Sequence, residues 1–283
     1  MRRLVFAIIA VFLCVSLYAQ EPSYEKVRFQ GYEREYFVVV PDSIAAERPL
    51  VVLLHGYGGS ARGYRPEMVD LARKEGFVLC IPQGFKDPSG ECGWNVRYPN
   101  QEGLGTDDVA FVSFLVRKMC RKYGLNRDNV FLTGMSNGGE MCYIMACERP
   151  EMFRAIASVA GLTMNWLVEE RPAPSKPVPF MEIHGTADRV SMWNGDPENT
   201  GGWGAYCSVP LAVGRICAAN KCTYEVIENL PLLKESSRQI ILHRYLGGAA
   251  EVRLYEVAGG PHSWHLDDID TVSEIWAFFK AQM

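Results

Sequence analysis

The sequence lacks several features that mark common classes of protein. It has 29 Lys and Arg residues against 33 Asp and Glu residues, and no basic cluster that would bind nucleic acid. Its five histidines and nine cysteines do not combine at zinc-ligand spacing, so we expect no metal and no cofactor. It contains no internal repeat and no low-complexity linker. These absences favour one globular domain whose substrate is neutral or is recognised by shape and stacking.

Long apolar runs are also scarce, and the longest stands at the N-terminus. Arg2 and Arg3 precede an apolar run over residues 4–17, and small and polar residues follow it, which is the order of a secretory signal peptide. The run is shorter than the roughly 20 residues of a membrane-spanning helix. Bulky residues before Cys14 disfavour lipidation. We therefore predict a signal peptide over residues 1–19 and a secreted or periplasmic protein, without membrane attachment after cleavage.

Short apolar runs rich in β-branched residues alternate with longer amphipathic stretches, which is typical of a largely parallel sheet covered by helices on both faces. The length of 283 residues suits one large α/β domain. Residues 50–54 are apolar throughout, which predicts a central strand. The predicted strands are 36–40, 50–54, 77–82, 129–133, 155–159, 180–184 and 251–257, and the predicted helices are 66–74, 107–123, 138–147 and 268–279.

One catalytic domain is expected over residues 20–283, with an insertion at about 190–246. The insertion is predicted to be irregular apart from a helix near residues 210–219, and to form a lid or substrate wall. Thr106 is the expected N-cap of the helix that follows it, and Gly124 is expected to end that helix.

Export would permit disulfides among the eight cysteines that follow Cys14, but their connectivity cannot be derived from sequence. Cysteines in strand-like or helical runs are predicted to be buried thiols, namely Cys80, Cys120, Cys142 and Cys147. Those in loop-like sequence are the better candidates for bridges, namely Cys92, Cys207, Cys217 and Cys222.

The segment Gly134-Met135-Ser136-Asn137-Gly138 fits the pattern G-x-S-x-G between a predicted strand and a predicted helix. In that context the glycines permit a strained turn that lifts the serine hydroxyl above the sheet, which is the nucleophile elbow of the α/β-hydrolase fold. The pattern alone is weak, but its context here is the required one. We predict that Ser136 is the nucleophile.

A serine needs a base, and in this fold the histidine lies between the last strand and the last helix. His262 and His265 both stand there, after the glycines of residues 259–260. We choose His262 because it is nearer the strand end, and we keep His265 as an alternative base, otherwise a surface or substrate-contact residue. His243 has no motif around it.

The acid should lie between the serine and the histidine in the chain, after a late strand. Asp188 follows the predicted strand 180–184 by four residues. Its carboxylate would accept the Nδ1 hydrogen bond of His262 and fix the tautomer of the imidazole. A loop-capping role is the alternative for Asp188, while the other candidate aspartates lie near helix starts, where capping explains them.

The oxyanion hole needs two backbone amides. One comes from the residue after the nucleophile, Asn137, and the other from the loop after an early central strand, where Tyr57 lies in a glycine-rich segment. His55 and His184 each stand before a glycine at a strand end, and we interpret both as structural.

The chain resembles the poly(3-hydroxybutyrate) depolymerase and feruloyl esterase group, which includes members of carbohydrate esterase family one. The resemblance covers most of residues 50–265 and is specific to the group, not to one substrate. The matching segments, in the group's order, are 54–59 (LHGYGG), 81–84 (IPQG), 93–95 (GWN), 106–109 (TDDV), 134–139 (GMSNGG), 183–188 (IHGTAD) and 259–264 (GGPHSW).

The resemblance implies the α/β-hydrolase fold with Ser136, Asp188 and His262 as the triad. It also implies a cysteine near Cys222 paired with one before the last strand, but Tyr245 and Leu246 stand there, so Cys222 would pair with Cys217 or stay free. The candidates for substrate contact are Trp94 and Asn95, on a loop that the resemblance places near the site, and Trp193, Trp203 and Trp264.

The sequence therefore predicts a secreted serine carboxylesterase that releases feruloyl or acetyl groups from plant cell-wall polysaccharide. A polyhydroxyalkanoate depolymerase is the alternative within the same group. A peptidase is disfavoured because no second large domain would gate peptides, and a non-catalytic binding protein because all three triad residue types are present.

Overall fold

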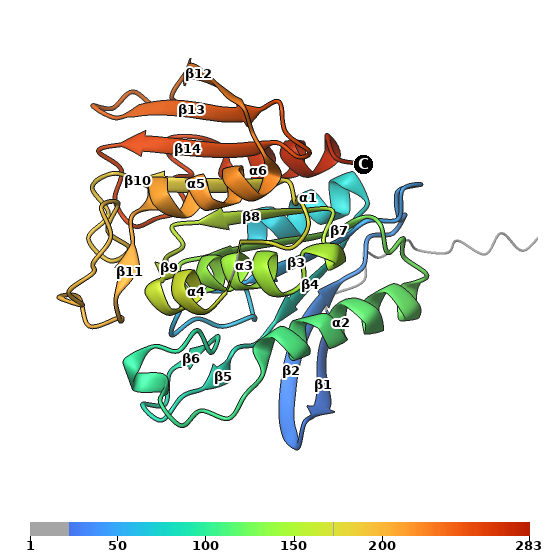
Figure 1. Ribbon diagram of the computed structural model, residues 1–283. Helices are drawn as coiled ribbons and strands as arrows, with labels where there is room; N and C mark the ends of the chain where they lie inside the picture. Colours follow the sequence, from blue (N-terminus) through green and yellow to red (C-terminus); the bar gives the residue numbers. More distant parts are fainter. Residues whose placement is uncertain (1–22, 172) are drawn as a thin grey trace, which may run out of the picture.

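The computed structural model describes residues 23–171 and 173–283, so the predicted signal peptide at residues 1–19 lies outside the described part (Figure 1). A ten-stranded sheet runs through the molecule in the order β1-β2-β4-β3-β7-β8-β10-β14-β13-β12. None of the helices in the described part is long and apolar enough to cross a bilayer.

The six central strands are parallel to one another, as the alternation of strands and helices predicted. All residues of β3 are apolar and buried, because helices cover both faces of the sheet there. These strands are β4 (Val78–Pro82), β3 (Leu50–Leu54), β7 (Val130–Met135), β8 (Ala155–Val159), β10 (Phe180–Gly185) and β14 (Val252–Ala258).

Two antiparallel strands extend each edge of this parallel core. β1 (Ser23–Phe29) and β2 (Tyr32–Val39) form one hairpin, and β12 (Tyr224–Leu230) and β13 (Gln239–Leu246) form the other. The second hairpin lies within the insertion, so the prediction that residues 190–246 are irregular apart from one helix is wrong for its second half. The backbone of β13 pairs with β14, which makes this half part of the sheet and not of a lid.

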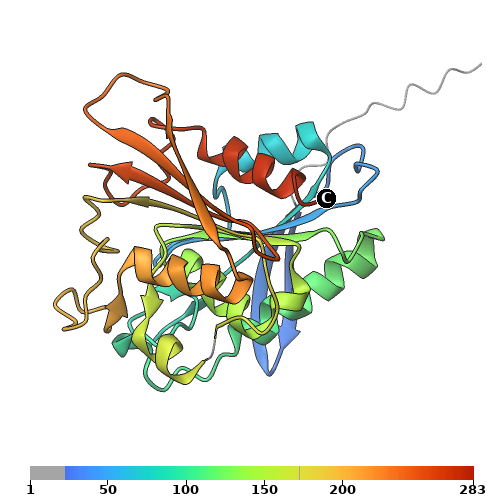
Figure 2. The same ribbon diagram turned by 45° about the horizontal axis from the view of Figure 1, so that its top comes forward.

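The helices form two layers, one on each face of the sheet (Figure 2). The predicted helix near residues 210–219 is confirmed as α5. One apolar cluster lies under α2 (Asp108–Tyr123), α3 (Asn137–Glu148), α4 (Asn165–Glu170) and α5 (Val209–Asn220). The other lies under α1 (Pro66–Glu75) and α6 (Thr271–Lys280).

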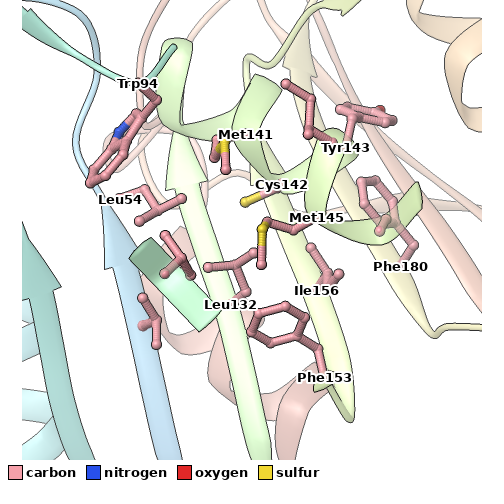
Figure 3. Packing of buried hydrophobic residues seen from close by; sticks show 14 of the residues in the cluster. Leu54, Trp94, Leu132, Met141, Cys142, Tyr143, Met145, Phe153, Ile156 and Phe180 are labelled. Carbon is pink, nitrogen blue, oxygen red and sulfur yellow. The ribbon is translucent and has the colours of Figure 1, made fainter. Parts of the chain in front are cut away.

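Helix α3 is central to the first layer and carries the segment after the predicted nucleophile. Met141, Cys142 and Met145 of this helix pack over Leu132 and Ile156 of the two strands beneath it (Figure 3). All five side chains are buried, five percent exposed or less. The start of α3 is thereby fixed against the carboxyl ends of the central strands.

The start of α2 differs from the prediction by one residue. The side chain of Asp107, not Thr106, caps the helix, because Asp107 Oδ1 accepts a hydrogen bond from the amide of Ala110 at 2.8 Å. The helix ends at Gly124 in the left-handed conformation (φ 61°), as predicted.

Short elements hold the loops at the carboxyl edge of the sheet. Two small sheets pair β5 (Phe85–Lys86) with β6 (Cys92–Gly93), and β9 (Thr163–Met164) with β11 (Tyr206–Cys207). A 3₁₀ turn covers Pro99–Gln101, and a second one, Pro150–Met152, lies at the opposite edge, before the start of β8. The β9–β11 pairing ties the first half of the insertion to the segment after β8.

All eight cysteines in the described residues are free thiols in this structure. None of the four bridge candidates is therefore bonded to another cysteine, although Cys217 and Cys222 are close enough to interact through their side chains. Cys80 and Cys142 are fully buried, and burial raises the pKa of both thiols.

Candidate active site

Ser136 lies at a sharp turn between β7 and α3. Its backbone angles are φ 56° and ψ −123°, a conformation that is costly for any residue with a side chain. Its amide donates to the carbonyl of Val159 on β8 at 2.8 Å, which holds the turn. A Cβ on Gly134 would lie 2.6 Å from the carbonyl oxygen of Gly138, so both glycines of the pattern are required by close packing. The local structure is the strained strand-to-helix turn that the pattern predicted.

The loop after β3 packs directly against this turn. A Cβ built on Gly56 would lie 3.4 Å from Ser136 Cβ and 3.9 Å from its Oγ. The amide of Tyr57 has no acceptor among the described residues, whereas those of Gly58 and Gly59 donate to Cys92 and Gly56. A free amide beside the turn is what an oxyanion hole requires.

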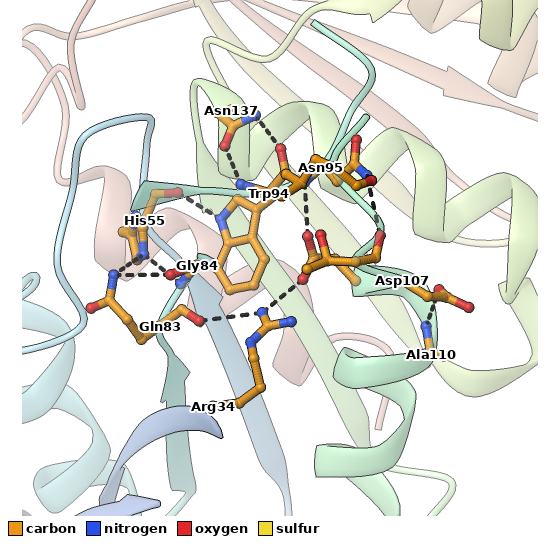
Figure 4. A network of polar contacts seen from close by, with 12 residues as sticks. Arg34, His55, Gln83, Gly84, Trp94, Asn95, Asp107, Ala110 and Asn137 are labelled. Carbon is orange, nitrogen blue, oxygen red and sulfur yellow. Dashed lines mark hydrogen bonds and ion pairs between the residues drawn. The ribbon is translucent and has the colours of Figure 1, made fainter. Parts of the chain in front are cut away.

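The second predicted oxyanion donor is the amide of Asn137. As the first residue of α3, Asn137 has no carbonyl of the same helix to which its amide could donate. Its side chain is occupied elsewhere: Oδ1 accepts from the amide of Trp94 at 2.7 Å, and Nδ2 donates to the Trp94 carbonyl at 3.1 Å (Figure 4). The side chain thus fixes the Trp94 loop to the helix start.

Asp188 and His262 meet in a short hydrogen bond. His262 Nδ1 lies 2.6 Å from Asp188 Oδ2, while Asp188 Oδ1 accepts from the amides of Val190 and Ser191 at 2.7 and 2.8 Å. Burial opposes the charge on Asp188, but the hydrogen bond and charge of His262 and the Val190 amide hold the pKa of Asp188 below its usual value. The side chain of His262 is 19% exposed, so its ring can meet a substrate.

The loops that carry these two residues are joined along their main chains. The amide of Ala187 donates to the carbonyl of Gly260 at 2.9 Å, and that of Gly259 donates to Thr186 Oγ1 at 2.9 Å. Strands β7, β8, β10 and β14 are neighbours in the sheet, so the segments after β7, β10 and β14 leave the same edge. The structure therefore brings Asp188 and His262 into contact and places Ser136 at the edge where they lie.

Trp94 and Trp264 were predicted to contact the substrate, but both are buried. Trp94 is 0% exposed, and its Nε1 donates to the carbonyl of His55 at 2.8 Å, so it braces the loop after β3 and cannot touch a substrate (Figure 4). Trp264 is 6% exposed and packs in the second apolar cluster, with the Arg65 guanidinium 5.5 Å from its ring centroid. Its place in the core leaves little surface for a ligand.

The side chain of Asn95 forms hydrogen bonds within its own loop. Its Nδ2 donates to the carbonyls of Leu104 and Thr106 at 3.0 and 3.1 Å, and its Oδ1 accepts from the amide of Arg97. The polar atoms of its side chain are therefore occupied within the protein.

The prediction for His265 is also wrong, because this residue is neither at the surface nor in a position to contact a substrate. It is 2% exposed, its Nδ1 contacts Asp268 Oδ2 at 3.2 Å, and burial lowers the pKa of its ring. It supports the His262 loop from within the protein.

The remaining predicted aromatics are half-buried in the first half of the insertion. The ring of Trp203 lies 5.5 Å from that of Tyr57 and 5.2 Å from that of Tyr98, between ring centroids. Trp193 meets the ring of His184 edge-on at 6.0 Å. Contact of Trp193 and Trp203 with a substrate remains a prediction.

Two buried carboxyl groups beside the site were not predicted from the sequence. Glu140, in the first turn of α3, accepts from the Tyr98 hydroxyl at 2.6 Å, and its burial raises its pKa to about 8. Glu182 points into the protein from β10 and contacts His184. A single acidic residue within a strand whose residues are all buried is the signal that could have identified Glu182.

Comparison with known proteins agrees with this geometry. Residues 34–171 match the family model described as esterase PHB depolymerase. Feruloyl esterase B of Neurospora crassa is 32% identical over 130 residues, which are 44% of this chain and 43% of that protein. The bifunctional acetylxylan esterase/xylanase XynS20E of Neocallimastix patriciarum is 29% identical over 165 residues, 58% of this chain and 22% of that protein. The chain thus spans less than half the length of either relative.

Among solved structures, the acetyl xylan esterase from Aspergillus awamori superposes with a TM-score of 0.60 at 18% identity. The superposition covers 90% of this chain and 99% of that one, and it establishes the α/β-hydrolase fold. The family match, the curated relatives and the fold agree with the resemblance found in the sequence. The chain is thus similar to the poly(3-hydroxybutyrate) depolymerase and feruloyl esterase group, and it has the α/β-hydrolase fold.

Proposed function

We propose that the protein hydrolyses carboxylic esters through an acyl-enzyme on Ser136. The observation that carries the proposal is the 2.6 Å hydrogen bond between His262 Nδ1 and Asp188, at the sheet edge that also holds the strained turn of Ser136. Because Nδ1 faces a carboxylate, the Nε2 atom of His262 is left unprotonated to act as a base. An ordinary serine hydroxyl would not react without such a base.

In the first half of the reaction, Ser136 Oγ attacks the ester carbonyl while His262 takes its proton. The negative charge that develops on the carbonyl oxygen would be bound by the amides of Tyr57 and Asn137. Asp188 stabilises the imidazolium and keeps the ring oriented. His262 then gives the proton to the leaving alkoxide, and the acyl group stays on Ser136.

In the second half, a water molecule replaces the alcohol. His262 takes a proton from the water as the oxygen attacks the acyl carbon, and it returns this proton to Ser136 Oγ as the acid leaves. No metal or cofactor takes part in this proposal.

The proposed substrates are feruloyl or acetyl esters on xylan or a related cell-wall polysaccharide. The names of the curated relatives support this class, since they include feruloyl and acetylxylan esterases. The aromatic rings of Tyr57 and Trp203, in contact beside the loop after β3, are suited to stack on a phenolic ring or a sugar face. The family description keeps polyhydroxyalkanoate as the second candidate substrate.

The proposed site of action is outside the cytoplasm. It rests on the order of basic, apolar and small residues over residues 1–19. N-terminal sequencing of protein recovered from the periplasm and the medium tests it, and an intact N-terminus on cytoplasmic protein would contradict it.

Activity is tested first with the Ser136→Ala variant. We expect it to lose fluorophosphonate labelling and to lose hydrolysis of methyl ferulate and p-nitrophenyl acetate by at least about 10³-fold. Ser237→Ala, which changes an exposed serine outside the site, is the matched control and should keep both. Unchanged hydrolysis by Ser136→Ala would exclude the proposed nucleophile.

The substrate is tested with a panel of esters. Release of ferulate from arabinoxylan and of acetate from acetylated xylan, compared with clearing of a polyhydroxybutyrate film, separates the two candidate substrates. Clearing of the film without release from either polysaccharide would replace the proposed substrate with the second one.

A further inference from the structure

Two titratable side chains that the proposed reaction does not use adjoin Asp188. Glu182 and His184 lie on β10, and both side chains are completely buried. His184 Nδ1 is 2.9 Å from Glu182 Oε1, and His184 Nε2 is 3.6 Å from Asp188 Oδ2. A line of four groups therefore runs from Glu182 through His184 and Asp188 to His262.

The contacts of His184 determine which of its ring nitrogens carry protons. Nε2 lies 2.7 Å from the carbonyl oxygen of Ser191, which can only accept, so Nε2 is protonated. Nδ1 lies 2.9 Å from Glu182 Oε1, which also accepts from the amide of Gly161 at 3.2 Å, so this contact fits an N–H that Nδ1 donates. Burial opposes a charge on His184, but Glu182 and then the Ser191 carbonyl raise the pKa of the ring. Both nitrogens therefore act as donors, and the ring is an imidazolium.

Other groups near this pair are neutral or bonded elsewhere. Tyr143 on α3 lies beside Glu182, and burial followed by the Glu182 charge raises the pKa of its hydroxyl, which stays protonated. Burial lowers the pKa of His265, which keeps that ring neutral. Glu256 on β14 pairs with His184 in register, but its carboxylate contacts His243 at 3.4 Å. His184 is thus the one cation between the buried carboxylates of Glu182 and Asp188 in the described part of the chain.

The same main-chain residue links His184 to the acid of the triad. Ser191 accepts from His184 Nε2 through its carbonyl and donates through its amide to Asp188 Oδ1 at 2.8 Å. A change in the charge or position of His184 therefore affects Asp188 in two ways, directly through electrostatics and indirectly through the main chain of Ser191.

We propose that His184, held as an imidazolium by Glu182, is a positioning residue that keeps Asp188 ionised and sets the pH at which His262 becomes a competent base. The inference rests on the proposed esterase function. Without the cation, Glu182 and Asp188 place two uncompensated negative charges beside His262 in a region that excludes water. Asp188 then holds a proton up to a higher pH, and a protonated Asp188 no longer supports His262 as a base.

The test is the pH profile of kcat/KM for p-nitrophenyl acetate between pH 4.5 and 9. His184→Gln removes the charge but leaves an amide that can donate to the Ser191 carbonyl. We expect its acidic limb to move to higher pH by about one unit with KM little changed. The double variant Glu182→Gln/His184→Gln removes one negative and one positive charge, and its limb should return most of the way to the wild-type position.

His55→Gln is the matched control. His55 is an equally buried histidine before a glycine, but it is neutral, so its replacement should lower the rate or the Tm without moving the limb. A folded His184→Gln variant whose limb stays at the wild-type pH would overturn the inference, because a purely structural role changes the rate and Tm only.

A second measurement covers the case in which His184→Gln does not fold. Long-range ¹H–¹⁵N spectra of the wild-type protein at pH 7 should show two protonated nitrogens for His184 and one for His55. A neutral His184 would overturn the inference whatever the variants do. If the wild-type protein hydrolyses no ester, the proposed function fails and these spectra still decide the charge of His184.

Discussion

Two His-Gly corners of this molecule look alike in sequence and differ in charge. His55 directly follows β3 and His184 lies near the end of β10, and both side chains are fully buried. His55 Nε2 accepts from the amide of Gly84 at 2.9 Å and Nδ1 donates to the carbonyl of Gly56 at 2.7 Å, so this ring is neutral (Figure 4). Burial accordingly lowers the pKa of His55.

His184 differs because a carboxylate and a carbonyl, both acceptors, face its two nitrogens. The same residue type at the same kind of corner thus has opposite protonation, according to what tertiary packing places around it. We interpreted both residues as structural from the sequence. The contacts of His55 agree with that interpretation, whereas those of His184 point to a part in the reaction.

Replacing each of the two histidines with alanine should have a large effect on stability, and the effect should differ between them. His184→Ala would leave Glu182 as an uncompensated buried carboxylate, which we expect to cost about 4 kcal/mol of unfolding free energy. His55→Ala would leave the Gly84 amide without an acceptor, at a cost of about 2 kcal/mol. Urea unfolding at pH 7 measures both. Equal losses would show that His184 carries no charge.

Glu140 is a buried carboxyl group that, unlike Glu182, has no cation beside it among the described residues. Glu140 has the Tyr98 hydroxyl as its donor and a pKa raised to about 8, so the folded protein holds its proton more tightly than the unfolded chain does. This stabilisation is complete below the unfolded pKa near 4.5 and is lost as pH rises through about 8. Between pH 6 and 8 the loss is about 2 kcal/mol.

Glu140→Gln should remove that loss. We expect the unfolding free energy of the variant to fall less than that of the wild type between pH 6 and 8, by about 2 kcal/mol at most, in urea titrations at both pH values. Glu140→Asp retains an acid as the control. A parallel fall in the variant and the wild type would mean that Glu140 is ionised at pH 6.

Trp94 supports the corner at His55, and its replacement should change the stability only slightly. Trp94→Phe keeps the ring but removes the hydrogen bond from Nε1 to the His55 carbonyl, which should cost about 1 kcal/mol of unfolding free energy. Because Trp94 does not contact the charged corner, the acidic limb of kcat/KM should stay in place. A shift of that limb would mean that the two corners are coupled.

The parallel core of the fold could be predicted because its strands are short apolar runs. β3 and β8 have the predicted bounds, and the other core strands end within two residues of them. The strand β12 was missed because its side chains are exposed along nearly its whole length, so neither face gives an apolar pattern. Its pairing with β13 depends on the backbone, which the sequence pattern does not reveal.

The candidate site could be predicted where the chain itself restricts the backbone or fixes the order of residues. The glycines around Ser136 predicted the turn, and the order of loops predicted that Asp188 and His262 would meet. Contact with substrate could not be predicted in this way. A tryptophan on a loop can face outward or inward, and Trp94 faces inward because Asn137 and His55 provide partners for its polar atoms.

The turn at Ser136, the succession of strands and helices and the residue types of the predicted triad follow from the sequence. They depend on local conformational limits and on chain order, which sequence patterns contain. Which side chains are buried, and what charge they carry there, depends on tertiary packing. Glu182 and His184 lie on one strand, but the carbonyl of Ser191, the amide of Gly161 and complete burial fix their protons, and these surroundings arise from packing.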